Sequence, residues 1–193
     1  MFVLSTESIR RARITLLLIT INIIFFITFN LAIEQNFFLL LVQDNDRIIN
    51  YYEYWRLLSA MFLHGDVLHL FSNMFALLIF GTFSESHFSR IAFIGLYITS
   101  GLIGNLFSLI LLPLNSISLG ASGCIFGLIG AAIVIIIKQR NKFLLILSGI
   151  YVLYFVISSF SPGINFYAHI FGLLGGFIFS FLLKRKERIE EYY

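Results

Sequence analysis

Long apolar runs dominate the chain, and short polar stretches separate them. Runs of this kind predict membrane-spanning helices, each of about 20 residues. Six such runs lie at about residues 14–33, 67–83, 91–112, 122–137, 143–160 and 164–183. The sequence therefore predicts an all-α, polytopic membrane protein with six transmembrane helices. We expect residues 1–193 to form a single domain, with about 14–183 embedded in the membrane and 184–193 forming a cytoplasmic tail.

Two connections depart from a simple bundle of helices. Residues 34–66 form a long segment between the first and second runs, and its tyrosines and Trp55 favour the membrane interface. The fourth run has only 16 residues, about 24 Å of helix against a hydrocarbon core of about 30 Å. We therefore expect the preceding loop, residues 113–121, to dip inward and to line a water-filled hollow.

Composition and charge support the membrane assignment. Of the 193 residues, 59% are hydrophobic and 12% charged, with a mean hydropathy of +0.94, which excludes an ordinary soluble domain. A single cysteine excludes a disulfide framework. Of the 13 Lys and Arg residues, all except Arg47 and Arg56 fall on the side of the N-terminus. The positive-inside rule then predicts a cell-membrane protein with both termini cytoplasmic. The placement of the basic residues therefore indicates the topology in the membrane. We expect the lipid bilayer as a partner and do not expect nucleic acid.

Two residues inside the runs are candidates for catalysis. The segment Gly120-Ala121-Ser122-Gly123 places a hydroxyl at a helix N-terminus, where free N–H groups can stabilise an oxyanion. Serine is also a common N-cap, and alone the motif favours that structural role. His169 lies at a similar depth in the last run, where an imidazole can accept the serine proton or simply hold the bundle together.

Small residues strengthen the pairing of these two. Glycines recur at helical spacing in the fourth and sixth runs, at positions Gly123, Gly127, Gly130, Gly172 and Gly176. Such stripes let two helices approach closely. Because Ser122 and His169 lie at the outer ends of the stripes, the same contact is expected to bring hydroxyl and imidazole together.

Further polar residues narrow the chemistry. His69 and Asn73 share one face of the second run, where they either donate hydrogen bonds to an oxyanion or hold this run to its neighbours. The chain lacks a His-Glu-x-x-His motif, and its aspartates lie outside the runs, so neither a zinc nor an aspartyl mechanism is expected. Cys124 reads as a small apolar filler. We expect no metal and no cofactor.

These features together closely resemble the rhomboid family of intramembrane serine proteases. The residues that carry the resemblance are Trp55, Arg56, His64, His69, Asn73, Glu85, Gly120, Ala121, Ser122, Gly123, Ala168, His169, Gly172 and Gly176. The resemblance implies a rhomboid-like six-helix bundle with a long extracytoplasmic loop between helices 1 and 2. It also implies that Ser122 is the nucleophile and His169 the general base, with no aspartate. His69, Asn73 and the Ser122 backbone N–H would form the oxyanion hole.

The resemblance also implies supporting roles. Trp55 and Arg56 would order the long loop, and His64 would support it. Glu85 would hold the cytoplasmic end of the second span, and Phe126 would stack on the catalytic base without offering a hydroxyl. Gly120, Gly123 and Gly172 complete the supporting set.

The expected function is endopeptidase cleavage of transmembrane or juxtamembrane segments through an acyl-enzyme. The partners would be single-span or other membrane proteins, and the active site would open to the extracytoplasmic side. One alternative is a catalytically silent rhomboid-like protein that binds transmembrane helices. A small transporter or channel is a third interpretation, but the chain shows neither an internal repeat nor a line of charges through the runs.

Overall fold

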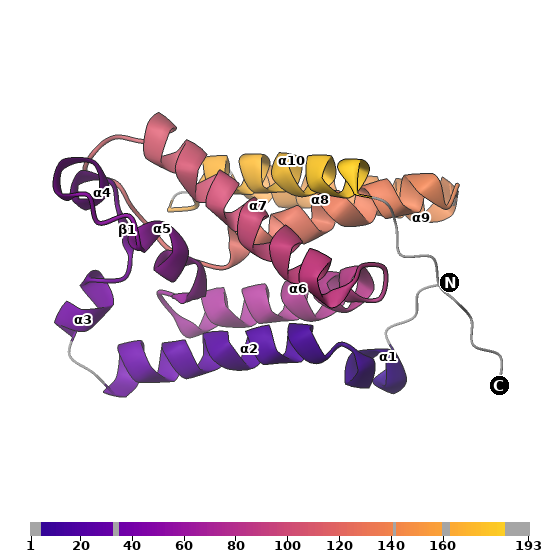
Figure 1. Cartoon of the computed structure of the whole chain (residues 1–193), viewed down its shortest axis with the longest axis horizontal. Coiled ribbons are helices and arrows are strands. Elements are labelled where there is room, and N and C mark those ends of the chain that lie inside the picture. The colour runs from indigo at the N-terminus through magenta and orange to yellow at the C-terminus, as the bar shows by residue number, and fades with distance from the viewer. Residues whose placement is uncertain (1–4, 33–34, 141, 160–162, 184–193) are drawn as a thin grey trace.

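The fold consists mainly of long helices that run along the longest axis of the molecule (Figure 1). The structure is a computed structural model, and it describes residues 5–32, 35–140, 142–159 and 163–183. The helices within the apolar runs are α2 (Arg13–Phe26), α6 (Val67–Glu85), α7 (Arg90–Leu111), α8 (Ser122–Lys138), α9 (Lys142–Ser158) and α10 (Phe166–Leu182). The short α1 (Thr6–Arg11) precedes them, and α2 continues as a π-helical segment, Ile27–Ala32. The predicted tail 184–193 and the predicted run ends at 33 and 160 lie outside the described residues.

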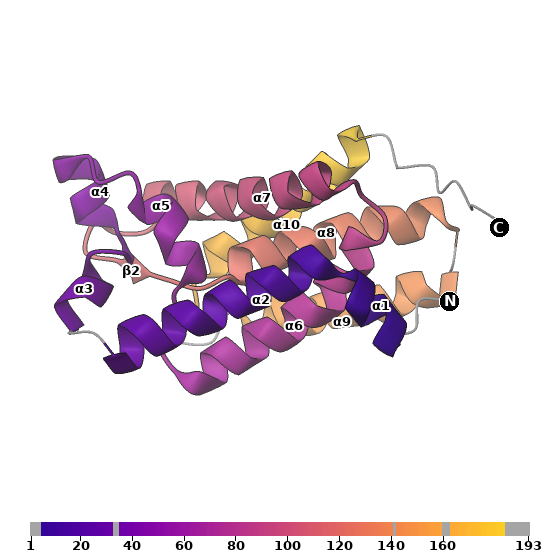
Figure 2. The ribbon, with the colours of Figure 1, turned by 60° about the horizontal axis from the view of Figure 1, so that its bottom comes forward.

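The segment between α2 and α6 has structure of its own. It contains α3 (Gln35–Leu39), β1 (Gln43–Asp44), α4 (Asn45–Tyr51), α5 (Arg56–Ser59) and a 3-10 turn, Ala60–Phe62. The strand β1 pairs antiparallel with β2 (Ile117–Ser118), which lies in the loop before α8. Gly120 N–H also donates to Ala60 O (2.9 Å). The loop before α8 is therefore fastened to this segment, at the end of the molecule opposite α1 (Figures 1 and 2).

Side-chain caps explain where several helices begin. Asp66 accepts from His69 N–H at the start of α6 (2.8 Å), and Ser89 accepts from Ala92 N–H at the start of α7 (3.3 Å). Asn165 Oδ1 accepts from Ala168 N–H (3.0 Å), so α10 begins at Phe166, two residues later than the apolar run. Ser122 does not act as a cap. The N-cap of α8 is Ala121, and no side chain caps that helix.

The central helix is α8, which contacts α6, α7 and α10. Nearly all of its residues are buried, as expected for a helix that is apolar all round. Its contact with α10 is backbone against backbone, because a Cβ added at Gly172 would run into Gly123 O, and one at Gly176 into Gly127 O. The two predicted glycine stripes therefore lie against each other.

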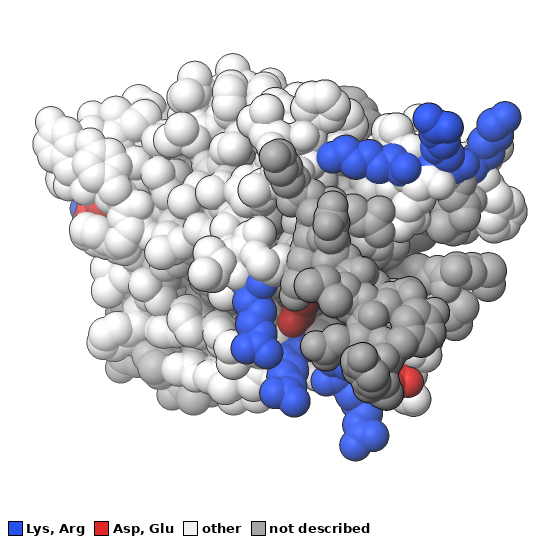
Figure 3. Space-filling model, turned by 45° about the vertical axis from the view of Figure 1, so that its right-hand side comes forward, with Lys and Arg blue, Asp and Glu red and all other residues white. Residues whose placement is uncertain are grey.

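Three helices in the described part of the chain are long and apolar enough to cross a membrane: Arg13–Asn30, Val67–Glu85 and Arg90–Leu111. The helices α8 and α10 are apolar too, but each has 17 residues, which corresponds to about 26 Å. Lys and Arg side chains gather at the end that carries α1 (Figure 3), where Arg10, Arg11, Arg13 and Arg90 line a pocket.

Candidate active site

Ser122 and His169 lie in hydrogen-bonding contact where α8 and α10 begin. The Ser122 Oγ and the His169 Nε2 are 2.8 Å apart. Ser122 is the first residue of α8, and His169 lies in the first turn of α10, so the close approach of the two helices sets their distance. The serine side chain is thus directed at an imidazole rather than at its own helix, which overturns the alternative that Ser122 is merely an N-cap.

His169 is held on its remaining sides as well. Its ring is buried and stacks on Phe126, with ring centroids 4.2 Å apart and planes inclined by 12°. Its second nitrogen, Nδ1, lies 2.6 Å from the hydroxyl of Ser159, a buried residue directly after α9. Sequence reasoning missed Ser159. A serine at the end of an apolar run is too common to stand out, and no spacing rule links it to a histidine ten positions later.

Gly120 separates the His69 ring from Ser122. Its φ of +127° falls in a region that favours glycine, and a Cβ there would lie 2.9 Å from His69 Nε2 and 3.8 Å from Ser122 Oγ. Any side chain at position 120 would therefore intrude between imidazole and hydroxyl. The conformation of this glycine keeps open the space beside Ser122.

Asn73 lies one helical turn after His69 and is buried. Its Nδ2 donates to the backbone carbonyl of His69 (2.9 Å). An amide group carries two N–H donors, so this bond engages only one of them. The side chain is braced within α6, one turn from the His69 ring.

Trp55 and Arg56 both contact the segment that leads from α3 to β1. The indole N–H of Trp55 donates to Leu40 O (3.3 Å). Arg56 is almost fully buried, donates to Leu39 O (2.6 Å) and Val42 O (2.9 Å), and pairs with Glu53 (2.6 Å). A buried guanidinium with a carboxylate and two carbonyl partners is well satisfied, so this pair of residues ties the segment to α5.

His64 lies fully buried in the loop before α6 and meets the ring of His69 edge-on, with centroids 5.0 Å apart. Burial lowers the pKa of His64 from its ordinary 6.5 to about 3; the nearby His69 adds to this shift and Asp66 opposes it. His64 is therefore neutral at ordinary pH. Its backbone carbonyl accepts from Asn30 Nδ2 (3.0 Å), which links the loop to the end of the first apolar run.

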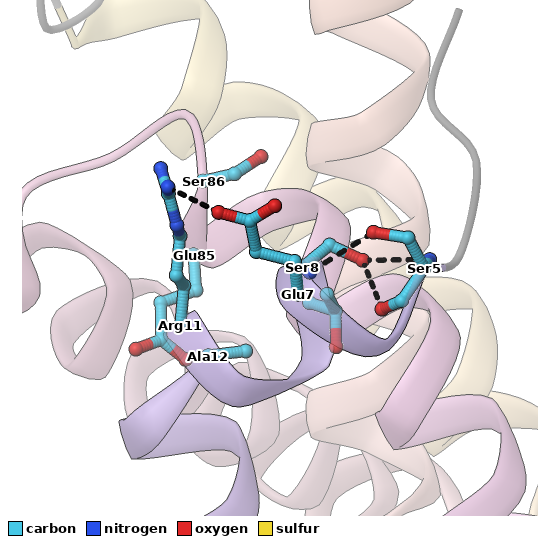
Figure 4. Close-up of a pocket in the computed structure, with 8 residues that line it drawn as sticks. Ser5, Glu7, Ser8, Arg11, Ala12, Glu85 and Ser86 are labelled. Atoms are coloured by element: carbon cyan, nitrogen blue, oxygen red, sulfur yellow. Dashed lines mark hydrogen bonds and ion pairs between the residues drawn. The ribbon is translucent and has the colours of Figure 1, made fainter.

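Glu85 serves the opposite end of α6, sixteen residues and about 24 Å along the helix from His69. Its carboxylate accepts from Ile14 N–H (3.0 Å), Thr15 N–H (2.8 Å) and the Thr15 hydroxyl (2.8 Å), and so caps the start of α2. Figure 4 shows the pocket beside it, which Glu7 and Arg11 also line. This pocket lies far from Ser122 and is separate from the candidate active site.

Comparison with known proteins places the chain among named relatives. A model of the Rhomboid domain matches residues 51–186. The chain is 35% identical over 144 residues to "Putative rhomboid protease YdcA" of Bacillus subtilis (strain 168), covering 70% of this chain and 71% of that protein. It is 35% identical over 145 residues to "RHOMBOID-like protein 6, mitochondrial" of Arabidopsis thaliana (72% and 47%). It is also 35% identical over 130 residues to "Rhomboid protease GluP" of Bacillus subtilis (65% and 25%). The chain thus spans most of the first relative and less than half of the other two.

Proposed function

The chain belongs to the rhomboid family, and on that premise we propose that it is an intramembrane serine endopeptidase. The observation that carries the proposal is the 2.8 Å contact between Ser122 Oγ and His169 Nε2. That distance lies within the reach a general base needs to take a proton from a nucleophile. The proposed substrates are other membrane proteins, cleaved within or beside a transmembrane helix.

The proposed reaction is acyl transfer to Ser122 and then to water. As Ser122 Oγ bonds to the substrate carbonyl carbon, its proton passes to His169 Nε2, and the carbonyl electrons move to oxygen. The tetrahedral intermediate then collapses, and His169 delivers the proton to the departing amine. Water attacks the acyl-enzyme in the same way and releases Ser122. The chemistry uses only hydroxyl, imidazole and N–H groups, so it requires neither metal nor cofactor.

The oxyanion is proposed to lie beside the N-terminus of α8. Because no side chain caps this helix, the Ser122 N–H stays available as a donor, at the positive end of the helix dipole. His69 Nε2 lies 2.9 Å from the point where a Cβ at Gly120 would be, and that point is 3.8 Å from Ser122 Oγ, which supports His69 as a second donor. The free N–H of the Asn73 amide is the third proposed donor. Donors fixed in advance in this way stabilise charge that develops only in the transition state.

The proposed topology has six spans, formed by α2, α6, α7, α8, α9 and α10, with both termini in the cytoplasm. Arg13 and Arg90 begin α2 and α7, while Lys138 ends α8 and Lys142 begins α9. These cations belong to the same end of the bundle, where Figure 3 displays the Lys and Arg side chains. The positive-inside rule favours the cytoplasm for that end, which leaves Ser122 open to the extracytoplasmic side.

A helical substrate must unwind before it can react, because its carbonyl groups are held in its own hydrogen bonds. The loop before α8 and helix α9 are the candidate moving parts that would admit it. Ser122 is only partly buried, so water can reach it for deacylation. The proposed substrate is thus a transmembrane segment with helix-weakening residues near the outer surface.

The test is cleavage of a labelled single-span substrate panel by the full chain in liposomes. The comparison set is the parent, Ser122→Ala, His169→Ala and Ser180→Ala. Ser180 is a matched control, since it is a buried hydroxyl on α10 whose contact is with Ala131 O (3.4 Å), away from the site. The parent and the control should cleave, and the other two variants should not. Retention of the labelled helices without any cleavage by the folded parent would instead favour the catalytically silent alternative.

A further inference from the structure

We propose that Ser159 is a positioning residue for His169, and that its hydroxyl selects the tautomer of the imidazole that can act as a base. The inference rests on the proposed function and adds a third group to the Ser122 and His169 pair. Its foundation is the distance of 2.6 Å between Ser159 Oγ and His169 Nδ1. Both side chains are buried, with Ser159 2% and His169 9% exposed.

The two contacts of His169 define its protonation pattern. Nε2 has to accept the proton of Ser122, so in the resting enzyme that nitrogen must present a lone pair. A neutral imidazole carries one proton, which then has to be on Nδ1. Nδ1–H needs an acceptor, and the oxygen of Ser159 is within hydrogen-bonding distance of it. If Nε2 carried the proton instead, it would point at Ser122 and the dyad could not start the reaction.

Because His169 is buried, the free energy of each tautomer depends on whether its N–H has an acceptor. A buried N–H without an acceptor costs free energy, and little water reaches a residue that is 2% exposed. Without the Ser159 oxygen, the tautomer with hydrogen on Nε2 would gain stability relative to the other, because that hydrogen could still be donated to Ser122. The Ser159 contact therefore shifts the tautomer balance toward the reactive form.

The same contact persists through the reaction. When Nε2 takes the Ser122 proton, the imidazolium keeps its hydrogen on Nδ1 and continues to donate it to Ser159. Ser159 gains no proton and touches no substrate, so its role is positioning rather than catalytic. The hydroxyl is uncharged and stabilises the imidazolium less than a carboxylate would.

The contact also joins two helices. Ser159 follows α9 directly, and His169 lies in the first turn of α10. Phe126 on α8 covers the face of the ring, so α8 and the turn after α9 together hold the imidazole that α10 carries. The end of α9 therefore contributes to the geometry of the dyad.

The experiment compares the parent with Ser159→Ala, Ser159→Thr and the buried-serine control Ser180→Ala, all as the full chain. Cleavage kinetics give kcat and KM, and ¹⁵N-histidine NMR reports which nitrogen of His169 carries hydrogen. We expect Ser159→Ala to lower kcat about 10- to 100-fold with KM nearly unchanged, in line with the loss of one hydrogen bond to a charged ring. We expect its NMR spectrum to show a mixture of the two neutral tautomers, one with hydrogen on Nδ1 and the other with hydrogen on Nε2. Ser159→Thr, which keeps the hydroxyl, should recover most of kcat.

Several outcomes would overturn the inference. One such outcome is a kcat for Ser159→Ala equal to that of the parent. Another is a lowered kcat with the tautomer of His169 unchanged, which would indicate a purely structural role for Ser159. If Ser159→Ala fails to fold, the NMR spectrum of the parent decides, since a parent with hydrogen on Nε2 contradicts the inference directly. An inactive parent would count against the proposed function, whereas an active parent with an equally active Ser159→Ala would count only against the role of Ser159.

Discussion

The ring of Phe126 lies flat against the imidazole of His169, with 4.2 Å between centroids and 12° between planes. The two residues come from neighbouring helices, α8 and α10, whose backbones touch. Phe126 follows Ser122 by one helical turn, so the hydroxyl and the aromatic ring rise on the same face of α8. The stack restrains the tilt of the imidazole, and the contacts at its two nitrogens restrain rotation within its plane.

We expect Phe126→Leu to lower kcat about 2- to 10-fold, because a stacked aromatic pair contributes about 0.5–1.5 kcal/mol beyond simple burial. Phe126→Tyr keeps the ring and serves as the control, with kcat close to that of the parent. Steady-state cleavage of one substrate by the three proteins measures the effect. Equal kcat for Phe126→Leu and the parent would show that the stack does not matter for turnover.

The backbone contact between α8 and α10 can be tested with a pair of glycines. A Cβ at Gly172 meets the carbonyl oxygen of Gly123, whereas a Cβ at Gly149 on α9 has nothing within 4 Å. We expect Gly172→Ala to lower the free energy of unfolding by about 1–3 kcal/mol, since the helices must move apart. Gly149→Ala should be neutral or slightly stabilising, because alanine favours a helix. Thermal unfolding in detergent compares the two, and an equal effect would refute the close contact.

Much of this arrangement could be predicted from the sequence because it depends on regular spacing. Each apolar run contains a helix, and the glycines at helical spacing meet in the structure. The expected contact of Ser122 with His169 followed from their places at the ends of those stripes, and the two side chains do lie together. The stacking of Phe126, by contrast, came from the family resemblance rather than from spacing.

Other features depend on contacts that leave no periodic signal. The two-residue pairing of β1 with β2 joins positions 43–44 to 117–118, and no local pattern marks such a short strand. The start of α10 at Phe166 reflects one capping amide, that of Asn165, inside a run that looks continuous by hydropathy. The contact of Ser159 with His169 arises only once α9 and α10 are packed. Long-range contacts between common residue types are visible in the fold and not in the sequence.

Glu85 and Glu7 line the same pocket (Figure 4) but should contribute unequally to stability. The Glu85 carboxylate receives three hydrogen bonds at the start of α2, two of them from backbone N–H groups. We expect Glu85→Gln to cost about 1.5–3 kcal/mol of unfolding free energy, the usual scale for bonds to a charged group. Glu7 pairs with Arg11 at the exposed surface, so Glu7→Gln should change little. A larger loss for Glu7→Gln than for Glu85→Gln would contradict this assignment.

The lowered pKa of His64 predicts that the free energy of unfolding depends on pH. The unfolded chain binds a proton at His64 near pH 6.5, whereas the folded chain does so only near pH 3. The unfolded state therefore holds more protons in that interval, and stability falls as the pH drops from about 6.5 toward 3. Above about pH 6.5 His64 is neutral in both states and its effect vanishes. We expect the melting temperature of His64→Phe to depend less on pH than that of the parent over this range. The same slope for both proteins would contradict the lowered pKa.

The central claim is that the hydroxyl of Ser122 is a nucleophile activated by His169, and covalent labelling tests it most directly, without knowledge of the substrate. The folded full chain is treated with a fluorophosphonate, and mass spectrometry locates the adduct. We predict an adduct on Ser122 in the parent and in Ser180→Ala, its loss in Ser122→Ala, and a much slower reaction in His169→Ala. A folded parent that forms no adduct at Ser122, or one that labels equally fast after His169→Ala, would contradict the claim.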